Sequence, residues 1–441
     1  MKKLLFAVTA TILVSSAAAF AVGGDENSRA SGDLSFDNVL NKLADEYSQG
    51  LKIPAAPVPQ DVKPGSDDRF WVTVRAADNR GRTRLLEAGM DIIEIKGDKV
   101  SGIIPKSLLP GLETKSFRMV TKIPFSEYIG GRAKDFPAAD AAYHNYQETA
   151  DLLAELAAKN TDIASLFSIG KTTQDRDIWC LRLNPVEKGE RQSSKPGVLY
   201  IGNHHAREHL SNEVPLLFAV WLLDNRNDPE IKKHLDTLDI YIIPMLNPDG
   251  VEHDVRRDKY NWYRKNMSVN SDGTFGVDLN RNYDERWCQA GASKIPGAPT
   301  YCGAAPFSEP ETKAVKRFIE ARKNLKTLMS YHSYGSLVLY PWGGIYTPVE
   351  NEKDRSVFEK MGKALAAPTK YKAQQASDLY AATGDTCDWA YANAGIFAFT
   401  TELEGFSFYP DASVIKMAVT TNIKAATYLL SVTDNPYKVL D

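Results

Sequence analysis

The sequence has no excess of charge of either sign and, beyond its N-terminal stretch, no apolar run long enough to span a bilayer. Its 441 residues carry 53 Lys and Arg against 56 Asp and Glu, for a formal net charge of -3. This balance provides no electrostatic reason to bind nucleic acid or an anionic membrane. Internal repeats and low-complexity tracts are also absent, and 43% hydrophobic residues are ordinary for a globular protein. The composition therefore excludes nucleic acid as an expected partner.

The N-terminal stretch has the features of a secretory signal peptide. Met1-Lys2-Lys3 is followed by apolar and small residues from 4 to 19, and Ala19-Phe20-Ala21 is a cleavage-type sequence. A membrane anchor is the alternative, but it would need a longer apolar stretch and a stop-transfer flank. We expect residues 1–21 to be removed. The mature chain is then expected to be secreted or periplasmic, with no membrane attachment.

Cysteine is scarce, with four residues in the whole chain, which limits the protein to two disulfides. Export makes disulfides permissible. Cys288 and Cys302 flank a segment rich in Gly, Ala and Pro, and we predict a bridge between them. Cys180 lies inside a strand-like apolar stretch and is expected to be a buried core residue.

The first part of the mature chain is predicted to contain a linker and a small domain. We interpret residues 22–68 as a polar segment ending in a proline-rich linker, with a possible helix at 33–49. Residues 69–126 then follow the order strand, helix, strand, strand, helix, strand, which is typical of the ferredoxin-like α+β fold. The strands are expected at 70–76, at 91–104 as a hairpin pair and at 116–123, and the helices at 82–88 and 107–112.

A longer pattern begins after a flexible, basic connector at 127–136, in which Arg132 to Asp135 form a candidate cleavage site. From 137 to 433 longer helices alternate with apolar strands, which predicts an α/β domain with a mixed, mostly parallel sheet and helices on both faces. Residues 434–441 form a tail. The expected strands are 177–183, 198–201, 238–245, 327–331 and 396–403. The expected helices are 147–159, 212–224, one from a Ser308 capping box to 322, and 412–430.

Histidine is also scarce, yet three of the seven fall within residues 204–209, directly after the predicted strand at 198–201. Clustered His and Glu at the carboxyl end of a buried strand predict a zinc site. In one register, His205 and Glu208 are joined by a distant third ligand, for which His332 after another strand is the candidate. In the other, His205 and His209 bind the metal from one helix with Glu208 as base, the inverted H-x-x-E-H arrangement.

Several motifs together resemble those of a known family. His205-Ala206-Arg207-Glu208, the segment 276–282, His332-Ser333-Tyr334 and Thr401-Glu402-Leu403 match, in order and spacing, the zinc metallocarboxypeptidases of the pancreatic carboxypeptidase A/B and bacterial carboxypeptidase T type. The resemblance covers about residues 137–433. It implies the metallocarboxypeptidase fold, and the domain at 69–126 resembles the family's propeptide, an intramolecular inhibitor of a monomeric zymogen.

The resemblance implies one zinc ion per chain, bound by His205, Glu208 and His332, with water at the open position. Glu402 is implied to be the general base, and Arg264 to stabilise the developing oxyanion. The substrate is implied to be a peptide or protein with a free C-terminal carboxylate. The residues implied to bind it are Arg207, Asn280, Arg281, Ser333, Tyr334, Tyr380, Asp385 and Cys387.

The chain departs from the family pattern at two places. Position 209 is His where many relatives carry Trp. In the pocket for the C-terminal side chain, Cys387 stands where basic-specific members have Asp, while Asp385 resembles the acid that lets carboxypeptidase T accept basic as well as apolar residues. Gly343 is expected to keep the pocket mouth open. These residues predict an apolar or dual apolar and basic preference.

Two other functions are compatible with the sequence. A catalytically inactive relative could serve as a peptide-binding module, although the intact ligands and Glu402 argue against it. A cell-wall peptidase of the same fold could cut γ-D-glutamyl bonds, although Asn280, Arg281 and Tyr380 favour ordinary peptides.

Overall fold

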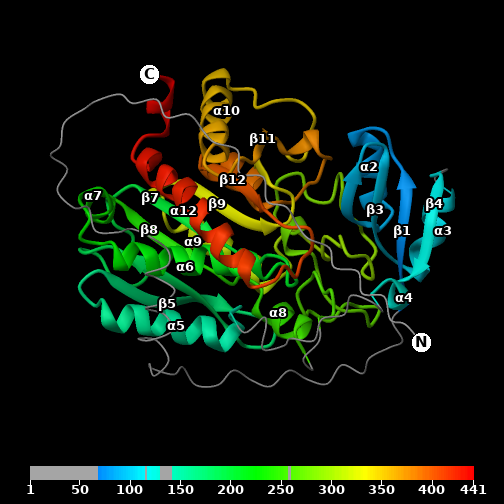
Figure 1. Cartoon of the computed structure of the whole chain (residues 1–441), viewed down its shortest axis with the longest axis horizontal. Helices are drawn as coiled ribbons and strands as arrows, with labels where there is room; N and C mark the ends of the chain where they lie inside the picture. Colours follow the sequence, from blue (N-terminus) through cyan, green and yellow to red (C-terminus); the bar gives the residue numbers. More distant parts are fainter. Residues whose placement is uncertain (1–67, 115–116, 130–141, 257–259) are drawn as a thin grey trace, which may run out of the picture. The chain divides into compact units, whose positions relative to one another are not determined.

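The computed structural model describes residues 68–114, 117–129, 142–256 and 260–441 (Figure 1). The predicted signal peptide, most of the predicted linker, the possible helix at 33–49 and the candidate cleavage site at 132–135 lie outside the described residues. Among the described residues, no helix combines the length and the apolarity needed to cross a bilayer.

The described chain begins with a small module, residues 69–129, built on a four-stranded antiparallel sheet of order β2-β3-β1-β4. Its apolar core includes Val72, Val74, Leu85 and Leu112. The strand and helix order is the one predicted. The elements are β1 (Arg69–Arg75), α2 (Asn79–Glu87), β2 (Asp91–Lys96), β3 (Lys99–Pro105), α3 (Leu109–Thr114) and β4 (Met119–Pro124).

Several boundaries of the module differ from those expected, and two of the differences have a clear physical cause. Helix α2 begins three residues early because the Asp78 side chain caps it, accepting a hydrogen bond from the Gly81 backbone at 2.6 Å. A further short helix, α4 (Phe125–Ile129), occupies the beginning of the predicted connector. It packs on the module, since Phe125 is fully buried and the Tyr128 ring stacks on Trp71 at 4.0 Å. The module therefore extends to residue 129, because apolar side chains of α4 pack against it.

The larger part of the chain contains an eight-stranded mixed sheet of order β11-β10-β12-β9-β7-β8-β6-β5. Its four central strands, β12, β9, β7 and β8, are parallel to one another, while β6 is antiparallel to β8 and β10 is antiparallel to β12. This confirms the predicted fold class. The strands are β5 (Ala164–Lys171), β6 (Asp177–Leu183), β7 (Gly197–Ile201), β8 (Asp239–Ile243), β9 (Leu325–Ser333), β10 (Leu337–Tyr340), β11 (Lys372–Gln375) and β12 (Phe397–Leu403).

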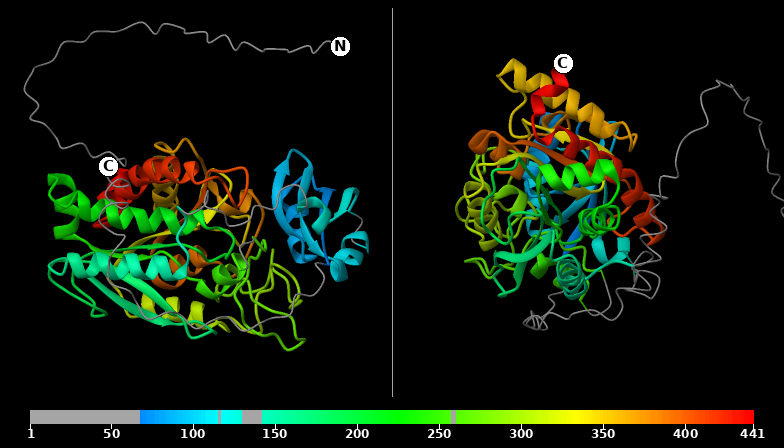
Figure 2. Two further views of the ribbon diagram at one scale, coloured as in Figure 1. Left: turned by 60° about the horizontal axis from the view of Figure 1, so that its bottom comes forward. Right: turned by 90° about the vertical axis from the view of Figure 1, so that its left-hand side faces the viewer.

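Helices cover both sides of this sheet (Figures 1 and 2). Strand β7 shows how the two cores arise, because Val198 and Tyr200 join one apolar cluster while Leu199 and Ile201 join the other. The first cluster contains residues of α5, α6, α7, α10 and α12, and the second contains residues of α9 and α11. The helices are α5 (Tyr146–Lys159), α6 (Leu210–Asp224), α7 (Pro229–Thr237), α8 (Pro248–Asp254), α9 (Pro310–Glu320), α10 (Glu352–Ala366), α11 (Thr386–Ala394) and α12 (Ser413–Thr433).

The predicted capping box at Ser308 is wrong. Helix α9 is preceded by Glu309 at its N-cap, and no side chain caps it. Ser308 instead donates to the Glu309 side chain at 2.6 Å, and Asn282 accepts bonds from the Glu309 backbone and from Thr312. A distant Asn thus bonds the start of the helix, while no side chain caps the N–H groups of its first turn.

The cysteines behave as expected. Cys288 and Cys302 form a disulfide, and Cys180 is free and buried. Cys387 is also free and buried.

Candidate active site

Three ionisable side chains from two strand ends converge beside the central sheet. His205 and Glu208 lie in the loop after β7, and His332 lies near the end of the neighbouring parallel strand β9. His205 Nδ1 is 2.8 Å from Glu208 Oε1, and His332 Nδ1 is 3.1 Å from both His205 Nδ1 and Glu208 Oε2. In the described part of the chain, these three residues are the one group of His, Cys, Asp or Glu side chains placed to hold a metal ion.

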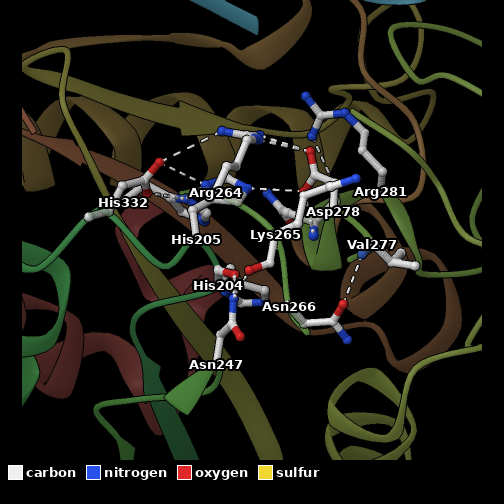
Figure 3. Close-up of polar contacts among 12 residues, drawn as sticks. His204, His205, Asn247, Arg264, Lys265, Asn266, Val277, Asp278, Arg281 and His332 are labelled. Atoms are coloured by element: carbon white, nitrogen blue, oxygen red, sulfur yellow. Dashed lines mark hydrogen bonds and ion pairs between the residues drawn. The ribbon is translucent and has the colours of Figure 1, made fainter. Parts of the chain in front are cut away.

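This donor set fits zinc. Ligand arms of 2.0–2.1 Å in a tetrahedron place neighbouring donor atoms about 3.3 Å apart, close to the separations found here. Although burial by itself raises the pKa of Glu208, the His205 imidazole lowers it well below its usual value, so the carboxylate is ionised. Burial lowers the pKa of His332, which favours the neutral imidazole that a metal requires. His205 and His332 are drawn in Figure 3.

His209 takes no part in this group, so the inverted register is wrong. Residue 209 is the N-cap of α6, and the stretch before it is not helical. Its Nε2 donates to Asp254 Oδ2 at 2.9 Å. His204 is also engaged elsewhere, with Nε2 2.7 Å from the Thr386 hydroxyl.

Asp278 links the metal group to Arg264 (Figure 3). Its Oδ1 lies 3.1 Å from His205 Nε2, and its Oδ2 accepts a bond from Arg264 Nε at 3.0 Å. A carboxylate on the far nitrogen of a ligating His fixes the ring so that Nδ1 faces the metal. Asp278 lies in the motif at 276–282, but its role could not be predicted from the sequence, because nothing in a linear motif indicates which ring it would contact.

A cavity of about 90 Å³ brings most of the predicted site together. Glu402 reaches it because β12 pairs in parallel with β9, with Glu402 directly opposite His332. Burial, and then the Glu208 carboxylate, raise the pKa of Glu402 to about 8. The predicted site residues that line the cavity are His205, Glu208, Arg264, Asn280, Arg281, His332, Tyr380, Asp385 and Glu402.

Comparisons with known proteins agree with this geometry. The family model described as zinc carboxypeptidase matches residues 149–425. A zinc carboxypeptidase of Saccharothrix mutabilis subsp. capreolus is 31% identical over 394 residues, covering 83% of this chain and 89% of its own. The chain belongs to the zinc carboxypeptidase family. Carboxypeptidase O of Bos taurus is 33% identical over 304 residues, covering 67% of this chain and 79% of its own.

Solved structures share the fold of this metallocarboxypeptidase. The carboxypeptidase A of Helicoverpa armigera aligns with a TM-score of 0.70 at 22% identity, covering 83% of this chain and 98% of that one. Thrombin activatable fibrinolysis inhibitor aligns with a TM-score of 0.64 at 23% identity, covering 83% of this chain and 100% of that one.

Within the carboxypeptidase cavity, Arg281 is held rigidly. It is 4% exposed, its Nε donates to Gly291 O at 3.0 Å, and its Nη1 donates to Asn280 O at 2.7 Å. Asn280 is anchored in turn, because its Oδ1 accepts from the Thr386 backbone and hydroxyl, both at 3.0 Å. A guanidinium and an amide are therefore pre-positioned on one wall.

Asp385 brings an unsatisfied oxygen to the same cavity. Its Oδ1 caps α11 by accepting from the Cys387 and Asp388 backbones at 2.9 and 3.0 Å. Its Oδ2 is buried without a hydrogen-bond partner in the described structure. Burial raises the pKa of Asp385. Since a buried polar atom without a partner is costly, this oxygen favours a ligand that brings a donor.

Four predicted substrate residues do not line this cavity. Cys387 packs in the core with its Sγ 3.2 Å from the hydroxyl of Thr400, and Thr400 lines the cavity in its place. The Ser333 backbone donates to Glu208 Oε2 at 3.2 Å. Tyr334 lines a separate groove of about 870 Å³. The fourth is Arg207.

Arg207 is paired with the N-terminal module. It is 1% exposed, its Nη1 donates to Asp91 Oδ2 at 2.6 Å, and its guanidinium lies 3.9 Å from the centre of the Phe408 ring. The module thus supplies a carboxylate to a cation that the family resemblance implies would bind substrate.

Proposed function

We propose that this metallocarboxypeptidase is an exopeptidase that removes the C-terminal residue of peptides and proteins. The observation that carries the proposal is the cavity in which the His205, Glu208 and His332 group, Glu402 and Arg281 meet. A metal group beside a carboxylate suits peptide hydrolysis, and a buried guanidinium suits recognition of a terminal carboxylate.

His205, Glu208 and His332 would hold one zinc ion. When bound, zinc polarises water and the scissile carbonyl as a Lewis acid. Glu402 accepts the proton of the attacking water and delivers it to the leaving amine. Arg264, oriented by Asp278 at 3.0 Å, stabilises the negative charge that develops on the carbonyl oxygen.

Arg281 and Asn280 would select a chain end over an internal bond. A planar guanidinium with two of its nitrogens already held by carbonyls binds a carboxylate without losing much conformational freedom. Tyr380, which lines the same cavity, would close over the bound residue.

The terminal side chain would occupy the part of the cavity beside Asp385. Apolar neighbours there suit aliphatic or aromatic side chains, and the unpartnered Asp385 Oδ2 suits a Lys or Arg. We infer a dual apolar and basic preference. The apolar neighbours and the small residue at the wall are Leu339, Gly343, Ala376, Leu379 and Ala382.

The N-terminal module would inhibit the enzyme in a zymogen that is secreted as a monomer after loss of residues 1–21. Besides the Asp91 contact with Arg207, α2 contacts the segment that carries Tyr380. Asn79 donates to Ser377 O at 3.2 Å, Arg82 donates to Leu379 O at 3.2 Å, and Thr83 accepts from the Ala381 backbone at 2.9 Å. These bonds engage the backbone on both sides of Tyr380.

An assay of blocked dipeptides ending in Phe, Leu, Arg or Lys tests the proposal, with each peptide also supplied as its C-terminal amide. We expect hydrolysis of the free acids only, loss of activity on chelation and recovery with added zinc. Trypsin treatment is expected to raise the activity. Hydrolysis of amides at the same rate would contradict the exopeptidase, activity that survives exhaustive chelation would contradict the metal, and full activity before trypsin treatment would contradict the zymogen.

A further inference from the structure

A buried carboxylate outside the catalytic cavity joins three segments, two of which contribute residues to the site. Asp254 ends α8 and is fully buried. It accepts hydrogen bonds from His209 Nε2 at 2.9 Å, from the Tyr263 backbone at 2.6 Å and from the Tyr409 hydroxyl at 3.0 Å. We refer to Asp254, His209 and Tyr409 as the Asp254 junction.

Two of the three segments lead directly to residues of the proposed site. His209 follows the metal ligand Glu208, and Tyr263 precedes Arg264. Tyr409 follows Phe408, whose ring lies under the Arg207 guanidinium. The junction therefore connects, through one anion, the main chains that carry Glu208 and Arg264.

The turn before Arg264, which the Asp254 junction contacts, is strained. Trp262 has a φ of 55°, in the left-handed region that a bulky side chain seldom adopts. Its backbone N–H donates to the Tyr409 hydroxyl at 3.0 Å, and the next N–H, of Tyr263, donates to Asp254. Such a conformation persists only where the surroundings hold it. These two consecutive bonds hold the N–H groups of the turn. The Asn261 N–H also donates to the Asp254 carbonyl at 2.8 Å, and Arg69 of the module donates to the Asn261 and Trp262 carbonyls at 3.1 and 3.3 Å.

Arg264 is then fixed at both of its ends. The Ala206 backbone donates to the Arg264 carbonyl at 3.0 Å, and Asp278 holds the guanidinium. If the preceding turn relaxed, the main chain of Arg264 would shift while Asp278 still held Nε and Nη2. The guanidinium would then turn about these two contacts, and its remaining donors would point away from the reacting carbonyl.

We propose that Asp254 is a positioning residue of this enzyme: together with Tyr409 it holds the strained turn at Trp262 and so aims Arg264 at the carbonyl oxygen of the substrate. The inference rests on the proposed role of Arg264. Asp254 contacts neither substrate nor metal, and it acts through the backbone of residues 262 and 263. His209 gives the same anion a link to the metal-binding loop.

The test compares Asp254→Ala, Arg264→Ala and the double variant, each expressed as the full chain and assayed in the form in which the wild type is most active. We expect Asp254→Ala to lower kcat about 10- to 100-fold, as displacements of about 1 Å do, with zinc content unchanged and KM little changed. In the Arg264→Ala background the same change should lower kcat by less than about twofold, because the group it positions is gone. Asp254→Asn, which keeps an acceptor for the Tyr263 N–H, is expected to restore most of kcat.

A matched control is Asp354→Ala. Asp354 accepts from the hydroxyls of Tyr391 and Tyr437 at 2.8 and 2.7 Å, so it too joins separate segments through tyrosines, and it does not line the catalytic cavity. We expect this variant to lose thermal stability and to keep its kcat.

Should Asp254→Ala fail to fold, Tyr409→Phe provides the second test. It removes the hydroxyl that accepts from Trp262, and we expect a fall in kcat of about 3- to 10-fold that again disappears in the Arg264→Ala background.

Additive losses in the double variants would overturn the positioning role of Asp254, as would a loss of kcat in Asp354→Ala of the same size. An Arg264→Ala enzyme with wild-type kcat would instead refute the proposed role of Arg264. The two failures are thus distinguishable.

Discussion

Removing one hydroxyl from α2 should partly release the Tyr380 segment in the uncleaved chain. Thr83 is 6% exposed, and its Oγ1 donates to Asn79 O at 3.0 Å and accepts from the Ala381 N–H at 2.9 Å. Because a hydroxyl has one proton, the Tyr346 hydroxyl at 2.7 Å must donate to it as well. Thr83→Val keeps the shape of the side chain and removes all three bonds.

The magnitude follows from the group left without a partner. Ala381 is 1% exposed, so water does not readily replace the lost acceptor of its N–H. A buried donor without a partner costs about 1–3 kcal/mol. If this cost weakens the contact between α2 and the segment that carries Tyr380, the equilibrium constant for release of that segment from α2 rises roughly 5- to 150-fold. The Tyr346 hydroxyl adds little, because this side chain is 39% exposed.

The assay measures kcat/KM of the uncut chain on a blocked dipeptide, alongside the amount of chain that remains uncut. Thr73→Val is the matched control, since the Thr73 hydroxyl bonds Ser101 at 2.9 Å within the module's own sheet. We expect kcat/KM of the uncut chain to rise several-fold or more in Thr83→Val and to stay unchanged in Thr73→Val. Equal activities of the two uncut variants would refute the reasoning that α2 restrains Tyr380.

Three other variants test the site and the fold. Arg281→Ala should weaken substrate binding by about 2–5 kcal/mol, which would appear as a higher KM and as loss of the preference for free acids over amides. An unchanged preference would contradict the role of Arg281 in binding the terminal carboxylate. Glu402→Gln should lower kcat about 10²- to 10⁴-fold, while metal analysis should show an unchanged zinc content. A near-normal kcat would rule out Glu402 as the general base. Burial, and then Asp249, raise the pKa of Glu311 to about 8 in the folded chain, so between pH 4.5 and 8 the native state binds more protons than the unfolded state. The free energy of unfolding should therefore fall as the pH rises through this range, by up to about 1.4 kcal/mol per pH unit. In Glu311→Gln, denaturation measured at several pH values should show a flatter dependence of this free energy on pH. The same pH dependence as in the wild type would contradict this expectation.

Features that depend on neighbours in the chain could be predicted from the sequence. The alternation of strands and helices gave the fold class, because hydrophobic periodicity depends on which face of each element is buried. The Cys288 and Cys302 bridge closes a short local loop. The metal-binding group could also be predicted from the sequence, since His205 and Glu208 are three residues apart and His332 follows a second apolar strand.

The tertiary structure alone decided which partner each polar side chain found. His209 bonds Asp254, so His332 and not His209 joins the metal-binding group. Arg207 bonds Asp91 of the N-terminal module, 116 residues earlier in the chain. Register has the same effect, because the pairing of β12 with β9 sets Glu402 opposite His332 across about 70 residues of intervening chain. A side chain's type determines whether it can donate, accept or bind a metal, and this is readable from the sequence. Which donor faces it depends on the packing of distant segments around one core, and no local pattern encodes that choice.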